Sequence, residues 1–141
     1  MNNLKRILKH YLMPAWWVRR LFPAHALRRI ETAIRESEKH HAGQIRFAVE
    51  SALPTIPLLR RQSARGRALD VFSRLRVWDT EHNNGVLIYL LLADRDVEII
   101  TDRGVHARVG AQAWEHICRE METHFRNRQC EEGVLAGIRA V

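Results

Sequence analysis

The stretch that decides the fold is NNGVLIYLLLADRDVEIITDRGVH, residues Asn83 to His106. Its first half contains an unbroken apolar run, Val86 to Ala93, which lies between turn-forming residues. A run of this length without polar alternation predicts a strand that is covered on both faces of a sheet. Asp94 and Arg95 follow, and residues 97–100 then predict a second strand.

The same stretch resembles a second kind of structure. An apolar strand followed by Asp-x-Asp-x-Val also opens the haloacid-dehalogenase-type phosphotransferases, whose first Asp attacks phosphorus beside a magnesium ion. That chemistry also needs a downstream cation, usually Lys, and a later acidic pair. The chain has no Lys after Lys39 and no Asp after Asp102. We therefore predict a tight antiparallel hairpin with its turn at Asp94 and Arg95, and no phosphoryl-transfer aspartate.

Periodicity on both sides of the hairpin predicts a three-layer α/β domain with a small sheet. The expected helices cover residues 4–12, 23–41, 63–78, 114–125 and 134–138, and a further strand covers residues 44–51. Pro54 and Pro57 mark a loop, and Ser63 is placed to cap the helix that follows. Gly85 and Gly104 are expected in turns. Cys118 lies on the apolar stripe of its helix, which predicts a buried and unreactive thiol.

The positive charge of the chain is confined to its N-terminal part. The formal net charge is +7, and residues 1–29 contain seven bases and no acid, so the rest of the chain is neutral. A nucleic-acid-binding domain needs a basic face on its folded part. No nucleic-acid partner is expected.

Residues 1–21 form a segment distinct from the expected domain at residues 22–141. The Leu and Ile residues of 4–12 share one side of a helix that Pro14 should stop, and Trp16 and Trp17 follow. Such a segment suits an anionic membrane surface, with the tryptophans at the headgroup boundary. The cations that would add to this attraction are Lys5, Arg6, Lys9, Arg19 and Arg20.

Two other roles of this segment stay open. Its apolar side can pack on the domain, with the tryptophans covering a groove, or it can dock in the groove of a membrane-protein partner. Arg19, Arg20 and Pro14 argue against a cleaved signal peptide, and no run of roughly 18 apolar residues is present. We expect a cytoplasmic protein, peripheral on the inner face of the membrane.

Candidate ligand-binding residues lie at the ends of the expected strands. Glu50 ends the first strand and Asp102 the third, and loops at the carboxyl ends of strands gather into one crevice. Asn84 and His106 would complete a weak site for a divalent cation, calcium or magnesium. Alternatively, Asp102 merely begins the Gly104 turn and Glu50 pairs with an Arg.

An ordered series of landmarks resembles the TPM domain family over residues 22–141. The series comprises Glu31, Ile34 and Glu38, the run Gly43 to Glu50, the run Asn84 to Leu90, the run Val97 to Gly104, and the helix with Trp114, Ile117, Met121 and Phe125. The resemblance implies an α/β/α sandwich with a small mixed sheet, Rossmann-like but without a nucleotide-binding fingerprint. The residues that match near the family's crevice are Asn84, Gly85, Asp102 and Gly104.

The resemblance also implies a range of roles. Some relatives have been proposed as acid phosphatases, some bind calcium, and others assist membrane-protein assembly, repair or receptors. In this chain, "RRLFPAHAL" occupies the place of the family's usual early acidic residue, which argues against a metal site of the plastid type. We expect a membrane-surface accessory or protein-interaction module. The alternative is a metal-assisted phosphomonoesterase with its crevice near Asp102.

Overall fold

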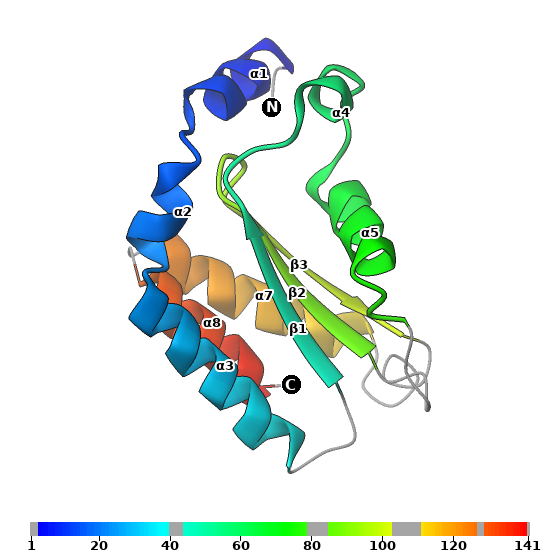
Figure 1. The fold of residues 1–141 in the computed structure, drawn as a ribbon. Coiled ribbons are helices and arrows are strands. Elements are labelled where there is room, and N and C mark those ends of the chain that lie inside the picture. Colours follow the sequence, from blue (N-terminus) through cyan, green and yellow to red (C-terminus); the bar gives the residue numbers. More distant parts are fainter. Residues whose placement is uncertain (1–2, 40–43, 79–84, 103–110, 127–128, 141) are drawn as a thin grey trace.

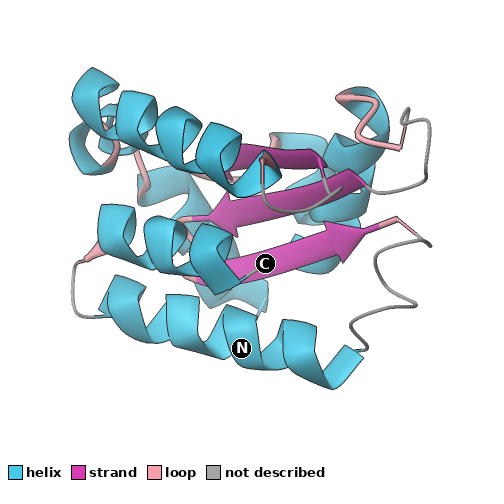
Figure 2. Cartoon of the chain, turned by 90° about the horizontal axis from the view of Figure 1, so that it is seen from below, coloured by secondary structure: helices cyan, strands magenta, loops and turns pink. Residues whose placement is uncertain are grey.

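The computed structural model describes residues 3–39, 44–78, 85–102, 111–126 and 129–140, and within these ranges a three-stranded sheet lies between helices (Figures 1 and 2). The elements are α1 (Asn3–Leu12), α2 (Trp16–Leu21), α3 (Ala24–Glu38), β1 (Gln44–Glu50), α4 (Thr55–Leu59), α5 (Ala64–Arg74), β2 (Gly85–Leu91), β3 (Asp96–Thr101), α7 (Ala111–Arg126) and α8 (Cys130–Ala140). The predicted mixed α/β sandwich is confirmed.

The sheet is mixed, with β2 at its centre. β1 runs parallel to β2, with Gln44 opposite Gly85 and Glu50 opposite Leu91. β3 runs antiparallel to β2, with Leu91 opposite Asp96 and Val86 opposite Thr101. All seven residues of β2 are buried, as its unbroken apolar pattern predicts.

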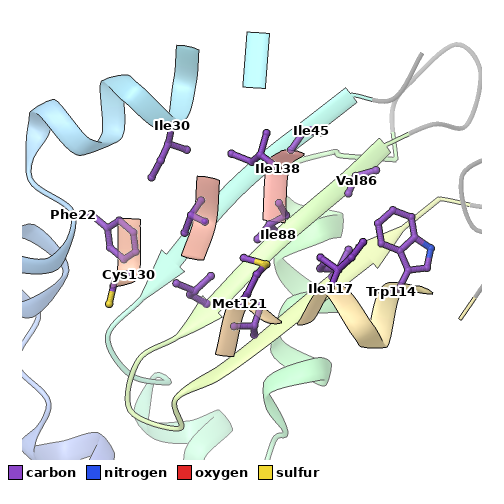
Figure 3. Packing of buried hydrophobic residues seen from close by; sticks show 14 residues of the cluster. Phe22, Ile30, Ile45, Val86, Ile88, Trp114, Ile117, Met121, Cys130 and Ile138 are labelled. Carbon is purple, nitrogen blue, oxygen red and sulfur yellow. The ribbon is translucent and has the colours of Figure 1, made fainter. Parts of the chain in front are cut away.

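The two faces of β2 pack against different helices. Val86, Ile88 and Leu90 belong to a core cluster that α3, α7 and α8 complete (Figure 3). Leu87, Tyr89 and Leu91 face the other way, into a cluster completed by α4 and α5. Because successive side chains of a strand point to opposite faces, one apolar segment supplies the centre of both layers.

The hairpin prediction is confirmed, although its turn is longer than two residues. Leu91 and Asp96 form the last ladder pair, so four residues, 92–95, connect the strands. The Leu92 and Ala93 amides donate to the carbonyls of Glu50 and Ser51, at 3.0 and 2.9 Å. Hydrogen bonds from the first two turn residues to the end of β1 therefore continue beyond the last pair between β2 and β3.

Most helix predictions are confirmed, with two short helices added. Ser63 caps α5 as predicted, because its Oγ accepts from the Gly66 amide at 3.0 Å. α2 was not predicted, and α4 occupies the segment predicted as a loop around Pro57. A proline is tolerated there because Pro57 is the third residue of α4, where a helix needs no amide donor.

Gly85 begins β2 and does not form the predicted turn, while Gly104 lies outside the described residues. A Cβ at Gly85 would lie 2.1 Å from the carbonyl oxygen of Val77. The glycine is therefore required for the close approach of two backbone segments rather than for a turn conformation.

We predict that Gly85→Ala destabilises the protein by about 2 kcal/mol or more, because backbone must move to admit the methyl group. Gly66→Ala is the matched control: its Cβ would lie 3.2 Å from Ser63 Oγ in a helix, where Ala is intrinsically favoured by about 1 kcal/mol. Chemical denaturation measures both. An equal effect of the two changes would contradict the role assigned to Gly85.

Candidate functional site

The predicted shared crevice of Glu50 and Asp102 is not formed. Glu50 lies opposite Leu91, whereas the Asp102 amide donates to the Gly85 carbonyl at 2.9 Å. These positions are at opposite ends of the sheet, about 20 Å apart for six residue steps along a strand. The reason is the direction of β3: because it runs antiparallel to β1, its carboxyl end meets the amino end of β1. Asn84 and His106 lie outside the described residues.

Glu50 instead forms a local network with Arg67 and Tyr89. Its Oε1 accepts from Arg67 Nε and from the Tyr89 hydroxyl, each at 2.8 Å, and its Oε2 accepts from Arg67 Nη2 at 3.0 Å. Burial would raise the pKa of Glu50, but the hydrogen bonds from Arg67 and Tyr89 outweigh it and keep this pKa below its ordinary value. This carboxylate is paired with an Arg, as one of the two sequence interpretations held.

The hairpin turn carries a second network, which holds the N-terminal helix. Arg6 of α1 donates to both oxygens of Asp94, with Nη2 to Oδ2 at 2.8 Å, and His10 Nε2 lies 2.7 Å from Asp94 Oδ1. His10 Nδ1 accepts from the Leu53 amide at 2.9 Å. We call Arg6, His10, Asp94 and the Leu53 amide the N-terminal clasp.

The hydrogen bonds of the clasp determine the tautomer of His10 and lower the pKa of Asp94. A neutral imidazole has one donor and one acceptor nitrogen. Since Nδ1 of His10 accepts from a backbone amide, the proton lies on Nε2 and is donated to Asp94. Burial would raise the pKa of Asp94, but hydrogen bonds from Arg6 and His10 more than offset this and lower it. Asp94 is thus a structural carboxylate that anchors α1.

α1 presents different chemistry on its two sides. The side towards the domain carries Arg6, Ile7 and His10, and Ile7 packs on the cluster that contains Leu58 of α4. On the other side Leu4, Leu8 and Leu12 remain 64%, 52% and 78% exposed. The helix therefore binds the domain through Arg6, His10 and Ile7, and leaves most of its apolar stripe exposed.

The two tryptophans that follow do not cover the exposed stripe of α1. Trp16 is 55% exposed and stacks on Trp17, with 5.2 Å between the ring centroids. Arg20 lies over the Trp17 ring, 5.1 Å from its centroid. Lys5, Lys9, Arg19 and Arg20 are exposed. The prediction that Arg6 also faces a membrane is wrong, because its side chain turns towards the domain and pairs with Asp94, and only 13% of it remains exposed.

An acidic cleft that the sequence analysis missed lies between β3 and α7. Its volume is about 550 Å³, and its lining includes Asp96, Glu98, Glu122, Arg65 and Cys118. Burial, the charges of Glu98 and Glu122, and a hydrogen bond with Glu122 raise the pKa of Asp96 to about 6. The alternation of Asp96 and Glu98 on one strand face was the available signal, but only tertiary structure brings Glu122 to them.

Three further observations limit what the described residues can do. Burial and the charges of Glu98 and Glu122 raise the pKa of Cys118 to about 12, which supports the prediction of an unreactive thiol, although Cys118 is only partly buried and lines the cleft. Within the described ranges, no group of three or more His, Cys, Asp or Glu side chains is arranged to hold a metal ion. In the same ranges every helix is too short or too polar to cross a bilayer.

Comparison with known proteins identifies the family. The model of the TPM domain matches residues 19–141. The chain belongs to the TPM domain family. The TPM match begins at residue 19, just before Phe22, which is buried in the core. No curated protein matches the sequence.

Two solved structures share the TPM fold of this chain. The NMR structure of the BA42 protein from the psychrophilic bacterium Bizionia argentinensis is 28% identical and superposes with a TM-score of 0.73, covering 84% of this chain and 77% of that one. The N-terminal domain of a protein from P. gingivalis is 20% identical with a TM-score of 0.70, covering 85% and 73%. The second likeness shows the fold alone.

We predict that Asp94→Ala destabilises the TPM domain by about 2–3 kcal/mol at neutral pH, because it leaves Arg6 and His10 without their acceptor. The lowered pKa of Asp94 means that its contribution is present above its ordinary value of 3.8 and is lost as the pH falls through the folded-state pKa. The difference between wild type and variant, measured by urea denaturation, should therefore shrink in acid.

Glu36→Ala is the control for the clasp. Glu36 pairs with Lys39 at 3.1 Å on the exposed side of α3, and loss of such a pair costs about 0.5 kcal/mol or less. If Asp94→Ala costs no more than Glu36→Ala, the clasp does not stabilise the fold.

We predict that Asp96→Asn stabilises the protein, on the order of 1 kcal/mol after allowance for solvent screening. The raised pKa of about 6, against an ordinary 3.8, means that the folded state is penalised above pH 6, where Asp96 is charged. The gain should fall as the pH drops from about 6 towards 4. Thermal denaturation across this range measures it, with Asp70→Asn on exposed α5 as control. A gain independent of pH would be inconsistent with the prediction.

Proposed function

We propose that this TPM domain protein is a membrane-surface accessory module that α1 and α2 hold against an anionic bilayer. The observation that carries the proposal is the two-sided character of α1. The side that carries Arg6 and His10 is bound to the domain through the clasp, while Leu4, Leu8 and Leu12 lie exposed on the other side. An apolar stripe presented outward from a fixed helix favours an external apolar partner.

Charge supports a lipid partner. Helices α1 and α2 carry no acidic residue, and their cations Lys5 and Lys9 on α1 and Arg19 and Arg20 on α2 are exposed. Basic residues near an anionic surface contribute about 1 kcal/mol each, and apolar side chains of an interfacial helix enter the boundary between headgroups and acyl chains. The stacked Trp16 and Trp17 suit the same depth.

Membership of the TPM family does not by itself specify an activity, because one fold supports many functions. A metal-assisted phosphomonoesterase needs acids that converge on one ion, and Glu50 and Asp102 lie at opposite ends of the sheet. The surface of α1 therefore favours the accessory role over the catalytic one.

Co-sedimentation with vesicles of phosphatidylcholine, with and without phosphatidylglycerol, tests the proposal. We expect the full chain to bind the anionic vesicles, to bind less as salt rises, and to lose on the order of tenfold or more in partitioning when Leu4 and Leu8 are replaced by Ser. Point substitutions are preferable to removing α1, since truncation would also remove the clasp.

Leu69→Ser/Leu75→Ser is the matched control. These residues are also exposed leucines, 48% and 52%, in and just after α5. The control should bind vesicles as wild type does, and all proteins should keep the same thermal midpoint. Absence of binding by wild type, or equal losses in the two double variants, would contradict membrane attachment and leave a protein groove as the partner of α1.

A further inference from the structure

We propose that α4 is a second membrane-contacting element, and that α1 and α4 together form one docking surface for an anionic bilayer. This inference rests on the proposed function and extends it to a segment far away in sequence. We define the docking surface by its exposed apolar residues, Leu4, Leu8, Leu12, Ile56 and Leu59, and by the exposed cations Lys5, Lys9, Arg60 and Arg61.

α4 has the same two-sided character as α1. Leu58 is buried in the core cluster on the α5 side of the sheet, as is Leu53 just before the helix. Ile56 and Leu59, three residues apart and so on one side of the helix, are 64% and 58% exposed. A short helix that is anchored by one leucine and exposes two other aliphatic side chains gains nothing from them within the fold.

The clasp holds α4 and α1 at the same end of the molecule. His10 of α1 accepts from the amide of Leu53, two residues before α4 begins, and bonds through its other nitrogen to the β2–β3 turn at Asp94. Ile7 of α1 and Leu58 of α4 also belong to one packed cluster. In Figure 1 both helices lie beyond the end of the sheet at which β1 finishes and the hairpin turns.

The two segments that form the docking surface carry charges of one sign. Residues 1–30 contain no acid, and neither do residues 51–69, so the segments that carry α1 and α4 are purely basic. Glu50, at the same end of the sheet, is paired with Arg67. The nearby Asp94 is paired with Arg6 and His10. Two apolar strips bordered by Lys and Arg are complementary to an anionic lipid surface.

The same charges argue against a second copy of the chain as the occupant. Pairing two such surfaces would place Lys and Arg of one molecule against those of the other, and facing like charges disfavour association. A bilayer can receive both helices at once and supplies the opposite charge. Docking through α1 and α4 would direct the hairpin end of the sheet to the membrane and the Gly85 end away from it.

Vesicle partitioning of Ile56→Ser/Leu59→Ser, with α1 intact, tests the inference. We expect this full-length variant to bind phosphatidylglycerol-containing vesicles on the order of tenfold more weakly than wild type. Leu69→Ser/Leu75→Ser again serves as control, and an unchanged thermal midpoint shows that α4 still folds.

A charge variant gives a second, independent measurement. Arg60→Gln/Arg61→Gln should weaken binding severalfold at low ionic strength and little at high ionic strength, because the cations act through a screened field. Arg46→Gln/Arg139→Gln removes the same charge from exposed positions on β1 and α8 and should have a smaller effect. Equal effects of the two charge variants would overturn the specific role of α4.

The outcomes separate this inference from the function on which it rests. Wild-type binding that is lost in Leu4→Ser/Leu8→Ser but unchanged in Ile56→Ser/Leu59→Ser would overturn the role of α4 and leave attachment through α1 standing. No wild-type binding would remove both. Size-exclusion chromatography with light scattering adds a further check: a dimer that Ile56→Ser/Leu59→Ser dissociates would identify α4 as a self-association surface and overturn the lipid assignment.

Discussion

The complete burial of β2 is the constraint on which the rest of this structure depends. A strand whose seven residues are all apolar or Gly, and all buried, must have helices on both of its faces and a strand on each edge. The antiparallel turn at residues 92–95 provides one neighbour, and β1 provides the other through a parallel crossover. The hairpin turn then contacts several elements: it lies beside the end of β1, and its Asp94 binds Arg6 and His10 of α1.

The N-terminal clasp links the core to the surface of the protein. An ionised carboxylate that is largely removed from water is stable when well-oriented donors satisfy it, and Asp94 has the charged guanidinium of Arg6 and the Nε2–H of a neutral His10. By using its polar side to bind the domain, α1 leaves its apolar stripe outside. This is the reverse of the usual arrangement, in which an amphipathic helix buries its apolar side and hydrates its polar one. The interactions of Asp94 with α1 therefore leave exposed the apolar side chains that we propose attach the TPM domain to a bilayer.

The prediction of a shared cation crevice is wrong for the same structural reason that the hairpin prediction is right. The carboxyl ends of two antiparallel strands joined by a tight turn lie at opposite ends of the sheet. Because β1 runs parallel to β2, the hairpin at Asp94 therefore separates Asp102 from every residue at the carboxyl end of β1. The direction of β1 relative to β2 was the missing fact. It depends on a crossover through α4 and α5, and an apolar pattern of period two is the same for either strand direction.

The sequence by itself determined the elements and their class: the buried strand, the hairpin, the cap at Ser63 and the helical periods are local properties, set by side-chain spacing and turn chemistry within a few residues. It also located the excess of positive charge, since charge is additive along the chain. Only the tertiary structure decided that Glu50 pairs with Arg67, that Glu122 joins Asp96, and that Arg6 and His10 face Asp94, 88 and 84 residues away. These contacts join residues whose spacing in sequence carries no information about their distance, because the packing of helices on the sheet, rather than local preference, brings them together.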